Sequence, residues 1–289
     1  MPIPFPDDER RTEAQLRQQY RVEQELAQRL LRAPKEARRS LYSEVYDEFL
    51  RRVPHQPLVQ QKEDRQAQAH LVALQTQLLE PFLTPETTFL EVGSGDSCLA
   101  LSLASRIRRV IAVEASAEMT RGLEAPENFR LVVADAPPYG LEEQSVDLAF
   151  SCHFIEHLHP EDAADHAVEI HRLLKPGGRY VVITPNRLLG PHDISKYFAD
   201  RAEGLHLKEY THTDLGALLR GAGFRSVQVL KGIGRPPVRI PLAQYRLAEA
   251  TTGALPAGLR RRVLDRLAER WDLNPPFRPL EQVKLVATR

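Results

Sequence analysis

The stretch Thr88-Phe-Leu-Glu-Val-Gly-Ser-Gly-Asp-Ser97 predicts how the central part of the chain folds. Its first half is apolar and typical of a short buried strand, which ends at Gly93-Ser94-Gly95. The mixed apolar segment 98–107 that follows is expected to be a helix. A strand, a glycine turn and a helix form the layout in which a parallel sheet binds a nucleotide-like ligand outside its carboxyl ends. Because Gly93 and Gly95 lack a Cβ atom, the backbone can turn tightly and a ligand can approach it closely.

Two acidic side chains, Glu91 and Asp96, flank this glycine turn. Carboxylates so close to the turn would repel a pyrophosphate. In addition, Cys98 stands where the dinucleotide pattern Gly-x-Gly-x-x-Gly needs its third glycine. The same carboxylates suit a ligand that carries an ammonium and a sulfonium group. The residues around the turn therefore favour S-adenosylmethionine (SAM) over NAD.

The next two predicted strands also end in acidic residues. The apolar strand 109–114 closes on Glu114, about 20 residues beyond the glycines, where an acid binds the ribose hydroxyls in nucleotide-binding α/β folds. This acid alone does not separate SAM from NAD, because both ligands carry an adenosine ribose. The strand 129–135 ends at Asp135, which is followed by Ala136.

The central region alternates predicted strands and helices, which is typical of a parallel sheet covered on both faces. We therefore expect an α/β protein with a doubly wound, mostly parallel, seven-stranded Rossmann-like sheet whose last strand is antiparallel. The expected strands are 88–93, 109–114, 129–135, 146–152, 178–184, 224–230 and 281–287, with helices at 98–107, 116–123, 160–174 and 213–220.

The segments on either side of this alternating region differ from it in composition. The first part is polar and predicts three helices, the first opened by Asp7-Asp8-Glu9 and ended by Ala33-Pro34, the others at 35–53 and 60–82. These helices would either form one wall of a substrate pocket or only cover an edge of the sheet. A late region contains proline-rich turns and a basic helix at 257–270. The expected division is a helical cap at 1–84, a ligand-binding core at 85–231, an insertion at 232–280 and a final strand at 281–289.

Composition narrows the functional classes. With 39 basic and 39 acidic residues in a chain of 289, no overall positive field is available to collect nucleic acid or anionic lipid. The Pro137-Pro138-Tyr139 triplet follows the third predicted strand, whereas a nucleic-acid methylase would carry such a signature after the fourth. No apolar stretch approaches the length of a membrane span, and the first residues do not have the pattern of a signal peptide. Cys98 and Cys152 both fall in the predicted core, so we expect a reduced, cytoplasmic protein. No nucleic-acid partner and no membrane span are expected.

Two further motifs occur in order along the chain: Glu156-His157-Leu158 after the fourth strand, and Leu174-Lys175-Pro176-Gly177-Gly178 at the fifth. With them, residues 88 to about 230 resemble the class I SAM-dependent methyltransferases, and most closely their broad small-molecule group. The resemblance implies S-adenosyl-L-methionine as cofactor. Its methionine end would lie near the glycine turn, its ribose at Glu114 and its adenine at Asp135. The SAM-binding residues expected on this basis are Glu91, Gly93, Ser94, Gly95, Asp96, Glu114, Ala115, Asp135, Ala136, Ser151 and Cys152.

The segment Ser151-Cys-His-Phe-Ile-Glu-His157 supplies the polar groups expected to face the transferred methyl. Its end resembles the Glu-x-x-Glu-His motif with which the ubiquinone-pathway O-methyltransferases bind a divalent metal, but His153 replaces the first Glu. Three roles remain open: a structural role in which Glu156 and His157 bond to nearby backbone, a general base, and a metal site. The structural role is favoured, and no metal is expected.

Two more polar clusters follow the fifth strand, Pro191-His192-Asp193 and Leu205-His206-Leu-Lys-Glu-Tyr210. They lie in a long segment at the carboxyl edge of the sheet, where substrate-side residues are common. Structural alternatives are that His192 caps the loop and that Lys208 and Glu209 form a solvated pair. The candidate catalytic residues are His153, His157 and His192, with His153 the first choice of base and His192 the second.

The function expected from these features is methyl transfer from SAM to a small-molecule acceptor, with a hydroxyl oxygen as the first choice. N- or C-methylation is an alternative, and so is a catalytically silent methyltransferase-like subunit that binds a partner through its helical cap. A homodimer is compatible with the sequence.

Overall fold

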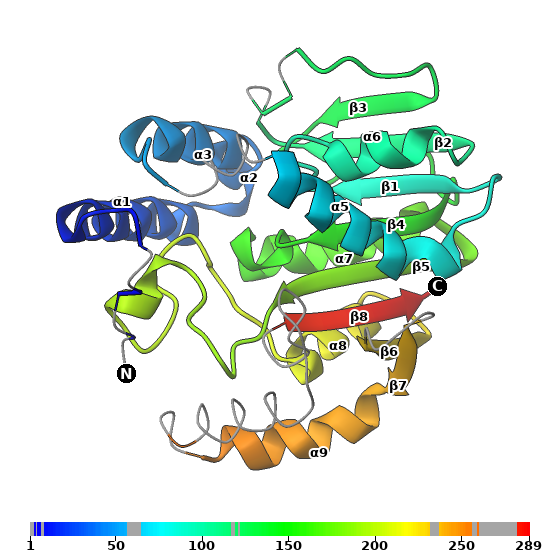
Figure 1. Cartoon of the computed structure of the whole chain (residues 1–289). Helices are drawn as coiled ribbons and strands as arrows, with labels where there is room; N and C mark the ends of the chain where they lie inside the picture. Colours follow the sequence, from blue (N-terminus) through cyan, green and yellow to red (C-terminus); the bar gives the residue numbers. More distant parts are fainter. Residues whose placement is uncertain are drawn as a thin grey trace.

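The computed structural model describes residues 3, 5–6, 9–56, 65–116, 119–120, 122–231, 237–255, 259 and 282–289. Eight strands form one sheet in the order β3-β2-β1-β4-β5-β8-β6-β7 (Figure 1). Strands β1 to β5 pair in parallel, and β8 is antiparallel to both β5 and β6. The strands are β1 (Thr88–Val92), β2 (Arg109–Glu114), β3 (Phe129–Val133), β4 (Val146–Cys152), β5 (Leu174–Pro185), β6 (Ser226–Lys231), β7 (Val238–Pro241) and β8 (Gln282–Thr288).

Helices cover both faces of the sheet, as expected for a doubly wound fold. One apolar cluster joins the sheet to α7, α8 and the first helices of the chain, and a second joins the opposite face to α5 and α6. The helices are α1 (Glu13–Arg32), α2 (Lys35–Arg38), α3 (Leu41–Arg52), α5 (Arg65–Leu79), α6 (Cys98–Ala104), α7 (Pro160–Leu173), α8 (His212–Gly221) and α9 (Leu242–Gly253), with 3₁₀ turns η1 (Glu80–Phe82), η2 (Ile155–His157) and η3 (Ile194–Tyr197). Among the described residues, no helix combines the length and apolar character needed to cross a membrane.

All seven expected strands are present, including the antiparallel last one. The eighth strand, β7, was not expected. It has only four residues and pairs with β6 at the edge of the sheet, so its sequence pattern is too short to predict a strand. The basic helix predicted at 257–270 falls almost wholly outside the described residues.

Three helix predictions were wrong in detail. The first helix starts after Thr12, not at Asp7-Asp8-Glu9, because Thr12 and Gln15 form a capping box. The helix expected at 35–53 is two helices, which meet near Ser40. The helix expected at 116–123 is absent at the described positions: residues 119, 120 and 122 form turns, and Gly122 has a φ of +76°.

The N-terminal helices are attached to α7 by a buried ion pair. The guanidinium of Arg38 donates to Asp162 from Nε (2.7 Å) and from Nη2 (2.9 Å). The Tyr42 hydroxyl donates to the same carboxylate over 2.6 Å. Arg38 and Asp162 are both buried, so removing Arg38 would leave the Asp162 carboxylate without its ionic partner, a change that typically costs about 3–5 kcal/mol.

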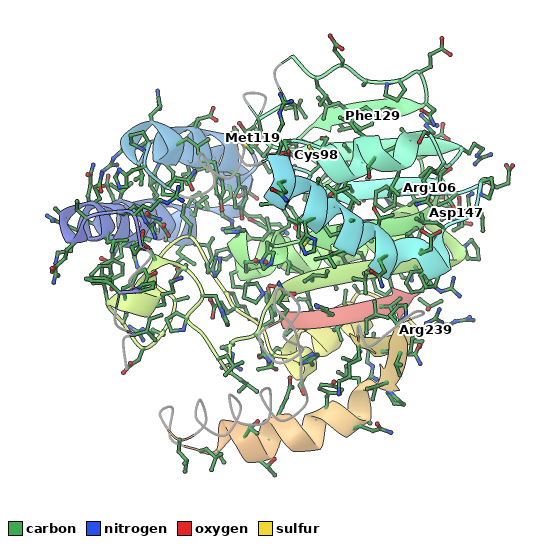
Figure 2. The ribbon with its side chains drawn as sticks, viewed as in Figure 1. Cys98, Arg106, Met119, Phe129, Asp147 and Arg239 are labelled. Atoms are coloured by element: carbon green, nitrogen blue, oxygen red, sulfur yellow. The ribbon has the colours of Figure 1, made fainter. Side chains whose placement is uncertain are left out.

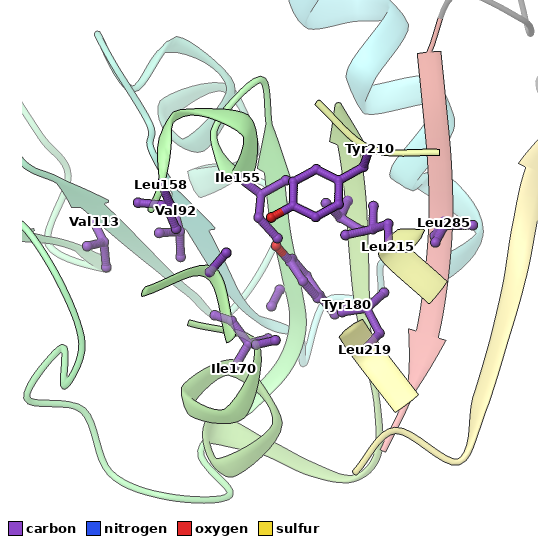
Figure 3. Close-up of a cluster of buried hydrophobic side chains, with 14 of the residues drawn as sticks. Val92, Val113, Ile155, Leu158, Ile170, Tyr180, Tyr210, Leu215, Leu219 and Leu285 are labelled. Carbon is purple, nitrogen blue, oxygen red and sulfur yellow. The ribbon is translucent and has the colours of Figure 1, made fainter. Parts of the chain in front are cut away.

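A chain of buried hydrogen bonds runs through the core between α7 and the sheet. The Tyr180 hydroxyl lies 2.6 Å from Ser151 Oγ and 2.9 Å from His166 Nε2, and His166 Nδ1 lies 2.8 Å from the Tyr139 hydroxyl. Burial lowers the pKa of His166 to about 3, so this imidazole is neutral. Figure 3 shows Tyr180 in this core next to Tyr210, a second fully buried tyrosine.

We expect Tyr180→Phe to lower the free energy of unfolding by about 1–3 kcal/mol, because the change leaves buried Ser151 and His166 without their shared partner. Tyr210→Phe is the matched control: the Tyr210 hydroxyl is equally buried but has no hydrogen-bond partner among the described residues. Its loss breaks no hydrogen bond, so Tyr210→Phe should not destabilise the protein. Urea denaturation of both variants measures the difference, and equal costs would contradict the assigned network.

Candidate active site

The glycine turn after β1 has the backbone conformation that its sequence predicts. Gly93 and Gly95 have φ values of +70° and +54°, which glycine adopts readily. The amides of Gly93 and Ser94 both donate to the Val113 carbonyl, over 2.9 and 3.2 Å. These bonds hold the turn against the end of β2.

The two glycines differ in what lies beside them. A Cβ atom on Gly93 would lie 2.5 Å from Cδ2 of Phe154, whereas one on Gly95 would meet only Met119 Cε, at 3.8 Å. The space beside Gly93 is therefore filled by the protein itself, through a phenylalanine that the sequence had not marked. Among the described residues, the backbone is less crowded beside Gly95 than beside Gly93.

Glu114 joins the ends of β1 and β2. Its carboxylate accepts from the Gly95 amide (2.8 Å) and from the amides of Ala115 and Ser116 (both 3.0 Å). These three bonds fix the carboxylate at the carboxyl end of β2, beside the glycine turn.

The other two acids of the turn are held by α6 and α5. Glu91 is buried and accepts from the Ala100 amide over 3.1 Å, and burial raises its pKa to about 8. Asp96 accepts from the Cys98 amide over 3.1 Å and contacts Gln68 of α5. Figure 2 shows Cys98 and Met119 at the end of the sheet that faces α3, and Arg106 and Asp147 at the opposite end.

Helix α3 crosses the carboxyl ends of three strands. Ser43 donates to Asp135, after β3, from its amide (3.1 Å) and its hydroxyl (3.0 Å). Asp47 accepts from the Ser116 hydroxyl, after β2, over 3.1 Å. The Tyr46 ring packs edge-on against His157, after β4, with 5.8 Å between centroids. The N-terminal helices thus form a wall over this edge. Burial raises the pKa of Asp135, and Ala136 beside it is partly buried.

The last two residues of β4 differ in environment. Ser151 is fully buried, and its hydroxyl belongs to the Tyr180 network, so it faces the core. Cys152 is partly exposed, and burial of its sulfur raises the thiol pKa to about 12. The thiol is therefore a neutral neighbour of the site and not a thiolate.

His153 and Glu156 form a pair directly after β4. His153 Nδ1 lies 3.2 Å from Glu156 Oε1, and its Nε2 lies 3.1 Å from the side-chain nitrogen of Gln282. Burial of Glu156 would raise its pKa, but the bond to His153 and the nearby imidazoles outweigh it and lower the pKa to about 2. Thr184 also donates to Glu156, over 2.9 Å. The backbone of His153 has a φ of +51°, and its imidazole is about half exposed. Glu156, in contrast, is fully buried.

The two polar clusters after β5 come together around Glu209. This carboxylate accepts from the His192 amide (2.7 Å) and pairs with His206 Nδ1 (2.9 Å). His192 Nε2 lies 2.9 Å from the Asn186 carbonyl. His192 thus holds the loop, which corresponds to the structural alternative named above.

His157 and His206 face each other, with ring centroids 4.9 Å apart. His157 Nδ1 lies 3.0 Å from the Leu205 carbonyl, and burial lowers the pKa of this imidazole to about 4. Burial acts in the same direction on His206, but the bond to Glu209 and the surrounding carboxylates outweigh it and raise its pKa to about 9. The sequence marked His206 as one of several polar residues; its position opposite His157 comes only from the folded loop.

A separate surface hollow of about 650 Å³ lies at the amino ends of the strands, lined by residues such as Thr88, Arg109 and Phe129. It is at the edge opposite to the glycine turn. Ligands of parallel α/β sheets bind at the carboxyl edge, so this hollow is not the candidate site.

The comparisons with known proteins show what this part of the chain is similar to. Residues 90–182 match the family described as "Methyltransferase domain". A probable S-adenosylmethionine-dependent methyltransferase of Mycolicibacterium smegmatis is 33% identical over 139 residues, which is 47% of this chain and 51% of that protein. The chain thus spans about half the length of this curated relative. Residues 90–182 of this chain are therefore similar to a methyltransferase domain, and a longer stretch is similar to a SAM-dependent relative.

Solved structures support the fold. A chain of the complex between the Haloferax volcanii Trm112 methyltransferase activator and a putative methyltransferase superimposes with a TM-score of 0.51 at 17% identity, covering 79% of this chain and 91% of that one. A SAM-dependent methyltransferase from Archaeoglobus fulgidus gives 0.50 at 18% identity, with 76% and 94% covered.

The residues at the carboxyl edge fit SAM. Beside Gly95, Met119 Cε is the one described side-chain atom within 4 Å of the Cβ position, and Glu114 is fixed where an acid binds ribose hydroxyls in such folds. Glu114 and Asp96 add acidic groups that suit the cationic ligand.

We expect Gly93→Ala to destabilise the protein and to impair SAM binding, because the added Cβ would collide with Phe154 in addition to adopting a positive φ. Gly140→Ala is the matched control: its φ is +66°, but nothing lies within 4 Å of its Cβ position. The control should show only the backbone strain of about 1–2 kcal/mol. Thermal unfolding and calorimetric SAM titration compare the two. Combining Gly93→Ala with Phe154→Ala should recover part of the lost stability, and no recovery would show that the collision is not the cause.

Glu114→Ala should weaken SAM binding more than tenfold. The change removes a carboxylate that fixes three amides and is placed to accept two ribose hydroxyls in charge-assisted bonds, each worth about 1.5–3 kcal/mol. Glu142→Ala, at an exposed position away from this edge, should leave the affinity unchanged. Calorimetric titration measures both, and an unchanged Kd for Glu114→Ala would refute the ribose assignment.

Proposed function

We propose that this chain transfers a methyl group from SAM to a hydroxyl oxygen of a small-molecule acceptor. The observation that carries the proposal is the His153–Glu156 pair at the end of β4, next to the glycine turn. An imidazole oriented by a buried carboxylate is the arrangement of a general base. A hydroxyl acceptor needs a base, whereas an amine that arrives unprotonated does not.

The site is proposed to bind SAM along the carboxyl edge, with the methionine end at Gly93, Ser94, Gly95 and Asp96. The ribose lies at Glu114 and Ala115, and the adenine at Asp135 and Ala136. Asp135 is already bonded to Ser43, so α3 would contribute to the adenine end. Glu91 acts from beneath the turn by holding the first turn of α6.

The chemistry then follows from the tautomer of His153. Its Nδ1–H donates to Glu156, which leaves Nε2 as the acceptor; in the present structure the Gln282 amide donates to it. The acceptor hydroxyl takes the place of that amide and gives its proton to Nε2. SAM supplies a methyl carbon activated by its sulfonium. Glu156 stays ionised and stabilises the imidazolium that forms. The rest of the rate enhancement comes from holding the acceptor oxygen in line with the methyl carbon.

The placement of His153 supports this role in two ways. The side chain is about half exposed, so an acceptor can reach it. The residue is also held in a left-handed backbone conformation, which is costly for a non-glycine residue and is concentrated at functional sites. His157 is less suited because burial lowers its pKa to about 4, and His192 is less suited because its Nε2 bonds to the Asn186 carbonyl.

N- or C-methylation and a silent partner-binding subunit remain the rival proposals. A silent subunit would bind no SAM in a calorimetric titration. The three bonds that fix Glu114 beside the glycine turn favour a working cofactor site.

We expect His153→Ala to lower the rate of methyl transfer at least a hundredfold while SAM affinity stays the same, since removal of a general base costs about 10²–10⁴ in rate. The assay follows labelled methyl from SAM to a panel of small phenols and alcohols, with amines for comparison. Added imidazole should restore part of the lost rate. His171→Ala, on α7 and packed against Phe224, is the matched histidine control and should transfer normally. Near-normal turnover of His153→Ala with saturating acceptor would refute the base and favour an amine acceptor.

A further inference from the structure

We propose that Glu156, His157 and His206 together bind a divalent transition-metal ion. One ligand atom from each of the three side chains lies within 4.8 Å of the other two. Glu156 and His157 come from η2, and His206 comes from the segment that leads into α8. The sequence suggested a metal only through His153, Glu156 and His157, and it favoured a structural role for the last two. In the folded chain the second histidine of the trio is His206.

The hydrogen bonds of the two histidines are those of metal ligands. His157 Nδ1 donates to the Leu205 carbonyl over 3.0 Å, and His206 Nδ1 pairs with the Glu209 carboxylate over 2.9 Å. In metal sites, a ligating histidine almost always donates its other ring N–H to a carbonyl or a carboxylate, which fixes the ring and its tautomer. In His157 this leaves Nε2 available to a metal, and in His206, whose pKa is raised, a metal would displace the proton at Nε2.

The charges around the trio also favour a cation. Glu156 is fully buried, Glu209 is 5% exposed and Glu23 of α1 is 4% exposed. Asp193 is a fourth acidic neighbour of His206. A concentration of carboxyl groups in a buried region is costly unless positive charge accompanies it. A divalent ion at the trio would supply that charge.

Two buried hydroxyls next to the trio are without partners. Neither the Tyr46 nor the Tyr210 hydroxyl has a hydrogen-bond partner among the described residues. The Tyr46 ring packs on His157, and Glu156 acts electrostatically on Tyr210. Figure 3 shows Tyr210 beside Ile155, the first residue of η2. A buried hydroxyl without a partner costs about 1–3 kcal/mol, and water bound to a metal would provide one.

The donor set decides the class of metal. Two imidazoles and one carboxylate are the ligands of catalytic zinc sites and of other first-row transition ions, which keep coordination positions open. Magnesium prefers an all-oxygen shell. We therefore expect Zn²⁺ or Co²⁺ to bind, and Mg²⁺ to bind much more weakly.

The test uses the full-length, untagged protein, freed of metal by a chelator and then titrated with Co²⁺ and with Zn²⁺. One ion per chain should bind, and the cobalt form should show visible d–d absorption. His206→Gln and Glu156→Gln should each raise the Kd at least about tenfold, whereas the control His171→Gln should match the wild type. Circular dichroism checks that each variant is folded.

A measurement on the wild type keeps the proposal testable if the variants do not fold. X-ray absorption of the zinc form should show only nitrogen and oxygen neighbours at about 2.0–2.2 Å. Sulfur in the shell, no stoichiometric binding, or equal affinity in His206→Gln and His171→Gln would overturn the proposal. Because these readouts need neither SAM nor an acceptor, a failure here leaves methyl transfer standing, and a loss of methyl transfer leaves the metal site standing.

Discussion

The buried charge of Glu156 is the constraint on which the functional edge of this protein depends. An ionised carboxylate away from water is tolerated only when it is paired and hydrogen-bonded. Glu156 is bonded to the half-exposed imidazole of His153 and to Thr184 near the end of β5, while its own carbonyl accepts from the Lys208 amide. The strand ends and the long loop after β5 are therefore tied to one residue, and that residue lies where the methyl acceptor is proposed to bind.

A second layer of organisation comes from α3. Its polar residues bond to the segments that follow β2 and β3, and its aromatic face packs on the segment that follows β4. A helix that only covered an edge of the sheet would not need these contacts. The N-terminal helices thus contact the candidate site, although the family match at 90–182 does not reach them. Features that decide the acceptor are expected in such added walls, because the central sheet is common to the class.

The sequence predicted the sheet well, because apolar strands ending in glycines or acids give strong local signals. It also predicted that Gly93, Gly95 and Glu114 would lie together, since the carboxyl ends of parallel strands share one edge. It did not predict that Phe154 fills the space beside Gly93, or that His206 faces His157. Those contacts depend on how a turn and a long loop pack in three dimensions, and no local pattern encodes them. The short strand β7 and the turns at 119, 120 and 122 were missed for a related reason: short segments near proline and glycine follow their tertiary surroundings more than their own propensity.

The ion pair between Arg38 and Asp162 has a consequence for how the protein is made. Its partners are 124 residues apart in the chain, so α1 to α3 leave the ribosome long before the acid that anchors them. Until α7 has been synthesised, their apolar residues can pack only against one another, and Arg38 remains in water. Docking of the cap is then a late step of folding, with the slow, long-range character of high contact order. The helices that line the candidate site are synthesised before the helix that anchors them, and they would be among the last to take their place.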